Sequence, residues 1–122
     1  MDEFIVVLTT TGSEKEAAVI ASALVDRYQA ACVSVIPSVR SIYRWKDKTW
    51  NEAEVVLLIK TTSSRFESVR RTIKELHSYE LPEVLSLNVG NGDEQTLEWI
   101  RDCVRRGEDS SAAKKPAANP EK

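Results

Sequence analysis

Two short runs of the sequence contain only apolar residues, FIVVL at residues 4–8 and VVLLI at residues 55–59. A strand with one face in water alternates apolar and polar side chains, because successive side chains point to opposite faces of the sheet. A strand that is apolar at every position avoids water on both faces. These two runs therefore predict a sheet that is covered on both sides.

A chain of 122 residues has little material with which to cover two sheet faces. Its apolar content of 42% is enough for one core, whereas two separate cores would each be too small to be stable. Soluble oligomers are mostly symmetric assemblies of one chain. We therefore expect identical copies of this chain to cover the second face.

Three amphipathic helices are predicted from capping residues and apolar spacing. Ser13 and Glu16 have the spacing of a capping box, in which the serine accepts from a helix amide and the glutamate reaches back to the cap amide. Ser64 and Glu67 predict a second capping box at the start of the second helix. Asp93 predicts the cap of a terminal helix.

Extended segments separate these helices. Residues 31–45 are rich in Val, Ile, Tyr and Trp, and Pro37 marks an edge or a bulge because proline has no amide for a ladder. The polar residues 46–52 predict the connection of a hairpin to a strand at 55–61, with Asp47 as a residue type that tolerates turn conformations.

A fourth strand is predicted at residues 83–89, so the order of elements is strand, helix, strand, strand, helix, strand and terminal helix. This is the βαββαβ order of the α+β ferredoxin-like class, with both main helices on one face of an antiparallel sheet. Residues 1–106 form this single domain. Residues 107–122 contain no Ile, Leu, Val or aromatic residue, and we predict a disordered tail there.

Charge and composition exclude several classes of protein. The chain has 17 Lys and Arg against 19 Asp and Glu, a balance that gives no overall attraction for nucleic acid. No apolar run approaches the roughly 20 residues that span a bilayer. The acidic N-terminus lacks the basic region of a secretory signal, and two cysteines cannot form a multi-bridge framework. We expect a cytoplasmic protein with reduced cysteines and no membrane or nucleic-acid partner.

Three segments of the chain stand out by their order and spacing: ACVSVIPSVRSIYRWKDK, EVVLLIKTT and HSYELPEV. In these segments the chain closely resembles the CutA family of divalent-cation tolerance proteins. The resemblance covers about residues 3–106. It implies a ferredoxin-like subunit in a tight homotrimer, with inter-subunit strand pairing similar to that of PII signalling proteins. It also implies ligand clefts between subunits, an association with copper and other divalent cations, and no established catalytic activity.

Cys32 and His77 are the candidate metal ligands. Cys32 stands at the position of the family's cysteine and suits Cu(I) or another thiophilic ion, with a small core residue as the alternative. His77 matches the motif histidine and suits copper or zinc, unless it only ends the second helix. These two side chains give at most two ligands, so tight binding needs carboxylates or a second subunit. Cys103 shares a helical face with Ile100, which favours a core role.

A groove between subunits is predicted to bind a small anionic or zwitterionic ligand. Five residues at strand ends are its candidate lining: Trp45, Lys60, Tyr79, Glu80 and Glu83. Because Lys60 is costly to bury alone, Glu80 or Glu83 is its expected partner. The alternatives are that both glutamates are solvated and that Trp45 packs on Trp50 across the hairpin.

The sequence contains no nucleophile elbow, Walker loop or H-E-x-x-H motif, and we expect neither catalysis nor an organic cofactor. Two functions follow from these observations and the resemblance. The first is a homotrimeric divalent-cation tolerance protein that binds copper or another divalent ion. The second is a PII-like signalling trimer that binds a small metabolite or a partner protein in its clefts.

Overall fold

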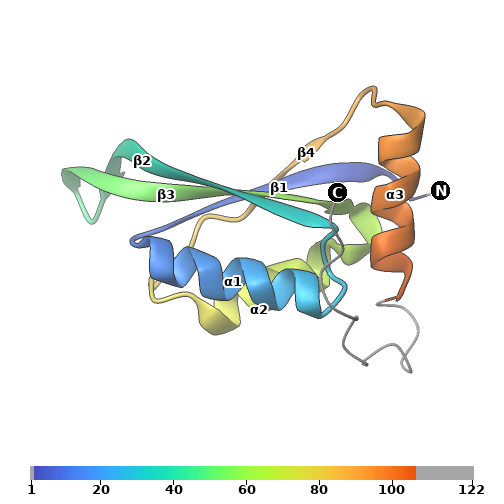
Figure 1. Cartoon of the computed structure of the whole chain (residues 1–122). Helices are drawn as coiled ribbons and strands as arrows, with labels where there is room; N and C mark the ends of the chain where they lie inside the picture. Colours follow the sequence, from blue (N-terminus) through green and yellow to red (C-terminus); the bar gives the residue numbers. More distant parts are fainter. Residues whose placement is uncertain (1, 107–122) are drawn as a thin grey trace.

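The computed structural model describes residues 2–106, in which four antiparallel strands form one sheet and three α-helices pack on it (Figure 1). The elements are β1 (Phe4–Thr11), α1 (Glu14–Asp26), β2 (Cys32–Trp45), β3 (Lys48–Thr62), a 3-10 helix (Ser63–Arg65), α2 (Phe66–Leu76), β4 (Leu85–Asn88) and α3 (Glu94–Arg105). The strand order β2-β3-β1-β4 confirms the ferredoxin-like prediction. The tail predicted at 107–122 lies outside the described residues.

Helices α1 and α2 cover one face of the sheet, and the core lies between them and the strands (Figure 1). Alternate side chains of β1 and β3 point toward these helices and are buried, as period-2 strand geometry requires. The fully buried core residues include Val7, Ile20, Leu24, Leu57, Ile59, Val69 and Ile73. None of the helices in residues 2–106 is long and apolar enough to cross a membrane.

The opposite face is apolar and largely uncovered, and we call it the open face. It consists of the side chains that alternate with the core residues: Val6, Leu8, Ile36, Val56, Leu58, Leu85 and Leu87. Ile36, Leu85 and Leu87 are 41%, 55% and 54% exposed. In the single chain, the second face of the sheet therefore lacks the cover that the two apolar runs predict.

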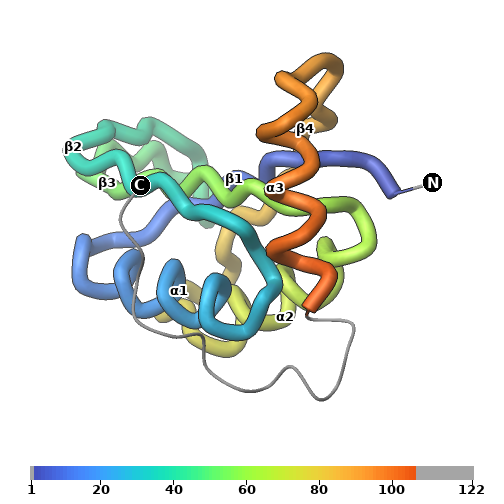
Figure 2. Tube along the Cα trace, turned by 45° about the vertical axis from the view of Figure 1, so that its right-hand side comes forward, coloured from blue at the N-terminus to red at the C-terminus, as the bar shows by residue number. Residues whose placement is uncertain are grey.

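Helix α3 covers only one end of the open face. The Arg101 guanidinium lies 5.0 Å from the centre of the Phe4 ring, near the start of β1. Figures 1 and 2 show α3 at the end of the sheet opposite to the tip of the β2–β3 hairpin. The Asp93 side chain accepts from the Thr96 amide at 3.1 Å, so the predicted cap of this helix is confirmed.

The β2–β3 hairpin is longer than predicted. Residues 46–52 were expected to form the connection, but β3 begins at Lys48 and only Lys46 and Asp47 form the turn. Both turn residues have positive φ, 53° and 65°, which is the geometry of a two-residue hairpin turn and matches the tolerance expected of Asp47. The predicted connection is therefore wrong, because cross-strand pairing of polar residues extends the ladder to the turn.

The predicted irregularity at Pro37 is confirmed. Strand β2 lies at the edge of the sheet, and its register with β3 shifts between Ile36 and Val39. Ser38 adopts a left-handed conformation, with φ of 63°. A bulge at this position lets an edge strand accommodate a residue that has no amide to donate.

Both predicted capping boxes differ from the structure. Ser13 accepts from the Glu16 amide at 3.1 Å, as expected, but the Glu16 carboxylate accepts from the Ser78 amide at 2.7 Å and not from the cap amide. The box at Ser64 and Glu67 is wrong. Ser64 lies in the 3-10 helix and donates to a distant carboxylate, and α2 begins without a side-chain cap.

Strand β4 is shorter than the predicted 83–89. It spans Leu85–Asn88 and pairs with β1, with Leu87 opposite Val6 and Leu85 opposite Leu8. Residues 77–84 form the loop between α2 and β4 (Figure 1), so part of the predicted strand is irregular. This α2–β4 loop forms one wall of the candidate site.

Candidate functional site

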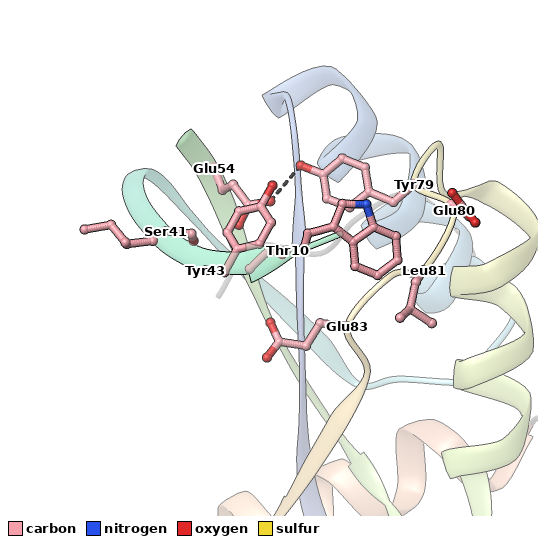
Figure 3. Close-up of a pocket in the computed structure, with 10 residues that line it drawn as sticks. Thr10, Ser41, Tyr43, Glu54, Tyr79, Glu80, Leu81 and Glu83 are labelled. Carbon is pink, nitrogen blue, oxygen red and sulfur yellow. Dashed lines mark hydrogen bonds between the residues drawn. The ribbon is translucent and has the colours of Figure 1, made fainter. Parts of the chain in front are cut away.

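A cavity of about 540 Å³ opens on the side of the open face, between the hairpin and the α2–β4 loop (Figure 3). Three segments supply its walls. The sheet contributes Thr10 and Glu54, the hairpin contributes Ser41, Ile42, Tyr43 and Trp45, and the loop contributes Tyr79, Glu80, Leu81 and Glu83. Four of the five residues predicted to bind a ligand therefore lie around one cavity.

The hydrogen bond between Tyr79 and Glu54 joins the loop to the sheet. The Tyr79 hydroxyl donates to Glu54 Oε2 at 2.6 Å, as the dashed line in Figure 3 marks. Burial and this hydrogen bond raise the pKa of Tyr79, so the phenol stays protonated and remains a donor. Glu54 is 6% exposed, and no cationic side chain of residues 2–106 forms an ion pair with it.

His77 holds the loop in place. Its Nε2 lies 2.6 Å from the Thr10 carbonyl, and its Nδ1 accepts from the Tyr79 amide at 3.1 Å. Since an amide only donates and a carbonyl only accepts, the ring carries its proton on Nε2. Both ring nitrogens are engaged, so His77 has no free lone pair for a metal ion in this conformation. His77 is also the C-cap of α2, and its backbone amide donates to the Ile73 carbonyl, while its ring binds β1 and not the end of the helix.

Lys46 lies beside two residues that line the cavity, Trp45 and Glu80. Its Nζ lies 3.4 Å from the Glu80 carboxylate and 5.6 Å from the centre of the Trp45 ring. Trp45 is paired with Lys48 in the ladder, and the Trp50 indole donates to the Trp45 carbonyl. The Trp45 side chain therefore lines the cavity, while its backbone carbonyl holds Trp50.

Lys60 lies outside this cavity. It is opposite Cys32 in the β2–β3 ladder, and its ammonium donates to the Ser34 hydroxyl and, at 3.6 Å, to the Cys32 sulfur. Within one chain, Lys60 therefore does not form the expected ion pair with Glu80 or Glu83. The two hydrogen-bond acceptors on the neighbouring strand satisfy the ammonium without a carboxylate.

Cys32 and His77 do not come together in one chain. Cys32 is level with Lys60 and hence with Val6 of β1, whereas His77 binds the carbonyl of Thr10. Four residues along a strand correspond to about 13 Å, which no single ion can bridge. Within residues 2–106, moreover, no group of three or more His, Cys, Asp or Glu side chains could hold a metal ion. The described side chains of one chain thus do not form a complete metal site.

Cys103 lies on α3, three residues after the buried Ile100, and is itself half-buried. Burial raises the pKa of its thiol, which keeps the sulfur neutral and agrees with the core role expected for it. The thiol lines a second cavity of about 310 Å³, between the end of α1 and α3, together with Tyr28 and Arg106.

Sequence reasoning missed Glu54 as part of the ligand cavity and Gly12 as part of its support. Glu54 directly precedes the apolar run VVLLI, and an acidic residue joined to a buried strand is a signal that could have drawn attention to it. A Cβ at Gly12 would lie 3.3 Å from the Tyr79 hydroxyl oxygen, so the small residue allows the loop to approach β1. This closeness depends on the tertiary fold, and no local pattern marks it.

The fold and cavity define a small α+β subunit with a ferredoxin-like sheet and one uncovered apolar face. The family model described as CutA1 divalent ion tolerance protein matches residues 5–103. The chain therefore belongs to the CutA family, and the family prediction is confirmed.

Curated relatives agree with this assignment. The chain is 41% identical over 97 residues to the divalent-cation tolerance protein CutA of Thermus thermophilus, a match that covers 80% of this chain and 94% of the relative. It is 40% identical over 101 residues to protein CutA of Homo sapiens, covering 83% of this chain and 56% of that protein. The chain thus spans nearly all of the bacterial relative and little more than half of the human one.

Solved structures give the same result. The structure of the divalent cation tolerance protein from Thermus thermophilus has a TM-score of 0.79 at 41% identity, covering 84% of this chain and 97% of that chain. CutA1 from Oryza sativa has a TM-score of 0.82 at 32% identity, covering 84% and 94%.

Proposed function

We propose that this chain acts in divalent-cation tolerance as a homotrimer that binds a small ligand in the cavity between the hairpin and the α2–β4 loop. One observation carries the proposal. Side chains from the sheet, the hairpin and the loop, including Glu54, Trp45 and Tyr79, converge on one cavity of about 540 Å³. This volume falls within the roughly 300–1,000 Å³ of small-molecule sites. The role is one of binding in the cytoplasm, without catalysis.

The open face supports the homotrimer. Leu85 and Leu87 expose apolar area beside Val6 and Leu8, and such a surface favours contact with another protein surface. The cavity opens on the same side of the sheet, so neighbouring copies that cover the open face would also come close to the cavity. Strand β2 is an edge strand with an unpaired side that another copy can extend.

Cys32 is the proposed ligand for copper or another divalent ion. The thiol is the soft ligand, and Lys60 already donates to its sulfur. Because His77 is engaged with Thr10 and Tyr79, the remaining ligands of such a site would come from neighbouring copies. A metal site of this kind forms only in the assembled protein.

The PII-like alternative is favoured by the size of the cavity. A single metal ion needs no space of this volume, whereas a small metabolite fills it and buries most of its own surface there. In this alternative the chain reports the presence of a metabolite to a partner protein, and divalent-cation tolerance is an indirect result.

Thermal unfolding of the purified full chain tests these proposals, because a ligand that binds only the folded state raises Tm, and the rise grows with the ligand concentration relative to Kd. Copper and zinc salts and a panel of metabolites are added to the wild type, Cys32→Ser and Glu54→Gln. A metal shift lost in Cys32→Ser supports the thiol site, and a metabolite shift lost in Glu54→Gln supports the cavity. If no addition raises the Tm of the wild type, the ligand-binding proposal is wrong.

A further inference from the structure

We propose that the cavity selects organic cations, namely small ammonium or guanidinium groups, through Glu54 and the aromatic side chains around it. The inference rests on the proposed function and specifies the chemical class of its ligand. It differs from the expectation of an anionic or zwitterionic ligand, in which Lys60 joined Trp45, Tyr79 and the carboxylates in a groove between subunits. Lys60 lies elsewhere on the sheet, bound to Ser34 and Cys32.

Glu54 is a buried carboxyl group beside the cavity. This residue is 6% exposed, and in residues 2–106 its one hydrogen-bond donor is the neutral phenol of Tyr79. Burying a carboxylate costs several kcal/mol unless an opposite charge accompanies it. Glu54 also lines the cavity, so a cation bound there would supply the missing charge.

The charged side chains that line the cavity are all acidic. Glu80 and Glu83 line it together with Glu54, and its lining includes no Lys, Arg or His of the described chain. The ammonium at the rim, that of Lys46, is already paired with Glu80. A bound anion would meet three carboxylates, of which only Glu80 is paired with a cation, whereas a bound cation is attracted by Glu54 and Glu83.

The protein itself places a cation at the rim of the cavity. Lys46 lies over the Trp45 ring and against the Glu80 carboxylate, with both contacts made by one ammonium. This shows that an ammonium fits between an indole and a carboxylate at the mouth of the cavity. Tyr43 and Tyr79 also line the cavity and offer further rings, and their hydroxyls are fixed by hydrogen bonds to Glu52 and Glu54.

The test is isothermal titration of the full chain with three probes of similar size, n-butylammonium, butyrate and n-butanol. We expect n-butylammonium to bind and the anion and the neutral alcohol not to bind. Glu54→Gln should weaken n-butylammonium binding by about tenfold or more, since it removes the buried charge and keeps the shape. Glu98→Gln makes the same change of charge on an exposed position of α3 and should leave the affinity unchanged.

The Tm of the Glu54→Gln variant without ligand gives a second measurement. With Glu54 lacking a cation in the free protein, Glu54→Gln should leave the Tm unchanged or raise it. A fall of several degrees would show that a cationic side chain of a second copy already pairs with Glu54, and would overturn the inference. Binding of butyrate in preference to n-butylammonium would overturn it as well, while leaving ligand binding in the cavity intact. No binding by any probe, with no metabolite shift, would remove the cavity proposal too.

Discussion

Two tyrosines in the same region of the molecule donate to glutamates in different surroundings. The Tyr79 hydroxyl donates to the buried Glu54 at 2.6 Å, and the Tyr43 hydroxyl donates to Glu52 at 2.7 Å on the exposed hairpin. The cost of losing a hydrogen bond depends on whether water can replace the donor. The two pairs therefore form a matched comparison within one protein.

Tyr79→Phe should lower the free energy of unfolding by about 1–2 kcal/mol, because Glu54 loses its one donor while it remains buried. Tyr43→Phe should cause no measurable change, since water can hydrate Glu52. Urea unfolding of both variants and the wild type measures the two effects. Equal losses would contradict the role assigned to burial.

Asp2 binds the segment that follows β3. Its carboxylate accepts from the hydroxyl groups of Ser63 and Ser64 and from the Ser64 amide. Partial burial pushes the pKa of Asp2 upward, but these hydrogen bonds outweigh burial and lower it from 3.8 to about 2. A folded-state pKa below the unfolded value means that the carboxylate contributes stability above about pH 4, and that this stability is lost as pH falls toward 2.

Asp2→Ala should therefore cost on the order of 1 kcal/mol at pH 6, after allowance for solvent around the carboxylate, and nearly nothing at pH 2. Urea midpoints of wild type and variant at pH 6, 4, 3 and 2 follow this convergence. Asp26→Ala, at the exposed end of α1, is the control and should show no such trend. A difference that stays constant with pH would exclude the proposed linkage.

At the scale of residues, sequence reasoning succeeded where a contact is local. Ser13 and Asp93 cap their helices as predicted, because each accepts from an amide three residues ahead. The same pattern failed at Ser64, because the Asp2 carboxylate, 62 positions away in the sequence, accepts from the Ser64 amide and hydroxyl. No local spacing reveals such a competitor.

At the scale of elements, the hairpin turn is the part with the clearest conformational cost. Lys46 and Asp47 both have positive φ, which costs an ordinary residue roughly 1 kcal/mol and costs glycine nothing. Asp47→Gly should raise the free energy of unfolding by about 0.5–1 kcal/mol, and Asp47→Ala should lower it. Chemical denaturation of the wild type and the two variants measures the order of their free energies of unfolding. An Asp47→Ala variant at least as stable as Asp47→Gly would contradict the turn geometry.

The length of this hairpin could not be predicted from composition. Residues 46–52 are polar, and polarity favoured a loop, yet Trp50 pairs with Tyr43 and the ladder reaches the turn. Pairing across strands decided the structure there, while the edge position and bulge at Pro37 followed from the chemistry of proline alone. The positions of Lys60 and His77 relative to the cavity depend on register and loop path, which is why the sequence grouped Lys60 with residues that it does not approach within one chain.

At the scale of the whole molecule, the two apolar runs make both faces of the sheet apolar, and the helices are too few to cover both. The helices supply cover for one side, and α3 reaches only the end of the other. This feature was predictable because it depends on the amount of apolar sequence and the number of helices. The residues that carry it, such as Leu85 and Leu87, follow from the strand alternation.

Replacing Leu85 and Leu87 together by Glu should dissociate the proposed trimer, because charges on the open face oppose its burial. Light scattering after size exclusion should give about three times the 13.7 kDa of one chain for the wild type, and a smaller mass for the double variant. Val19→Glu is the control, since Val19 is 50% exposed on α1, away from the open face. A wild-type mass of one chain at micromolar concentration would contradict the trimer, and an unchanged mass in the double variant would place the interface elsewhere.

Because the cavity opens on the same side of the sheet, measuring n-butylammonium affinity in the dissociated variant would further show whether a neighbouring copy contributes to the cation site.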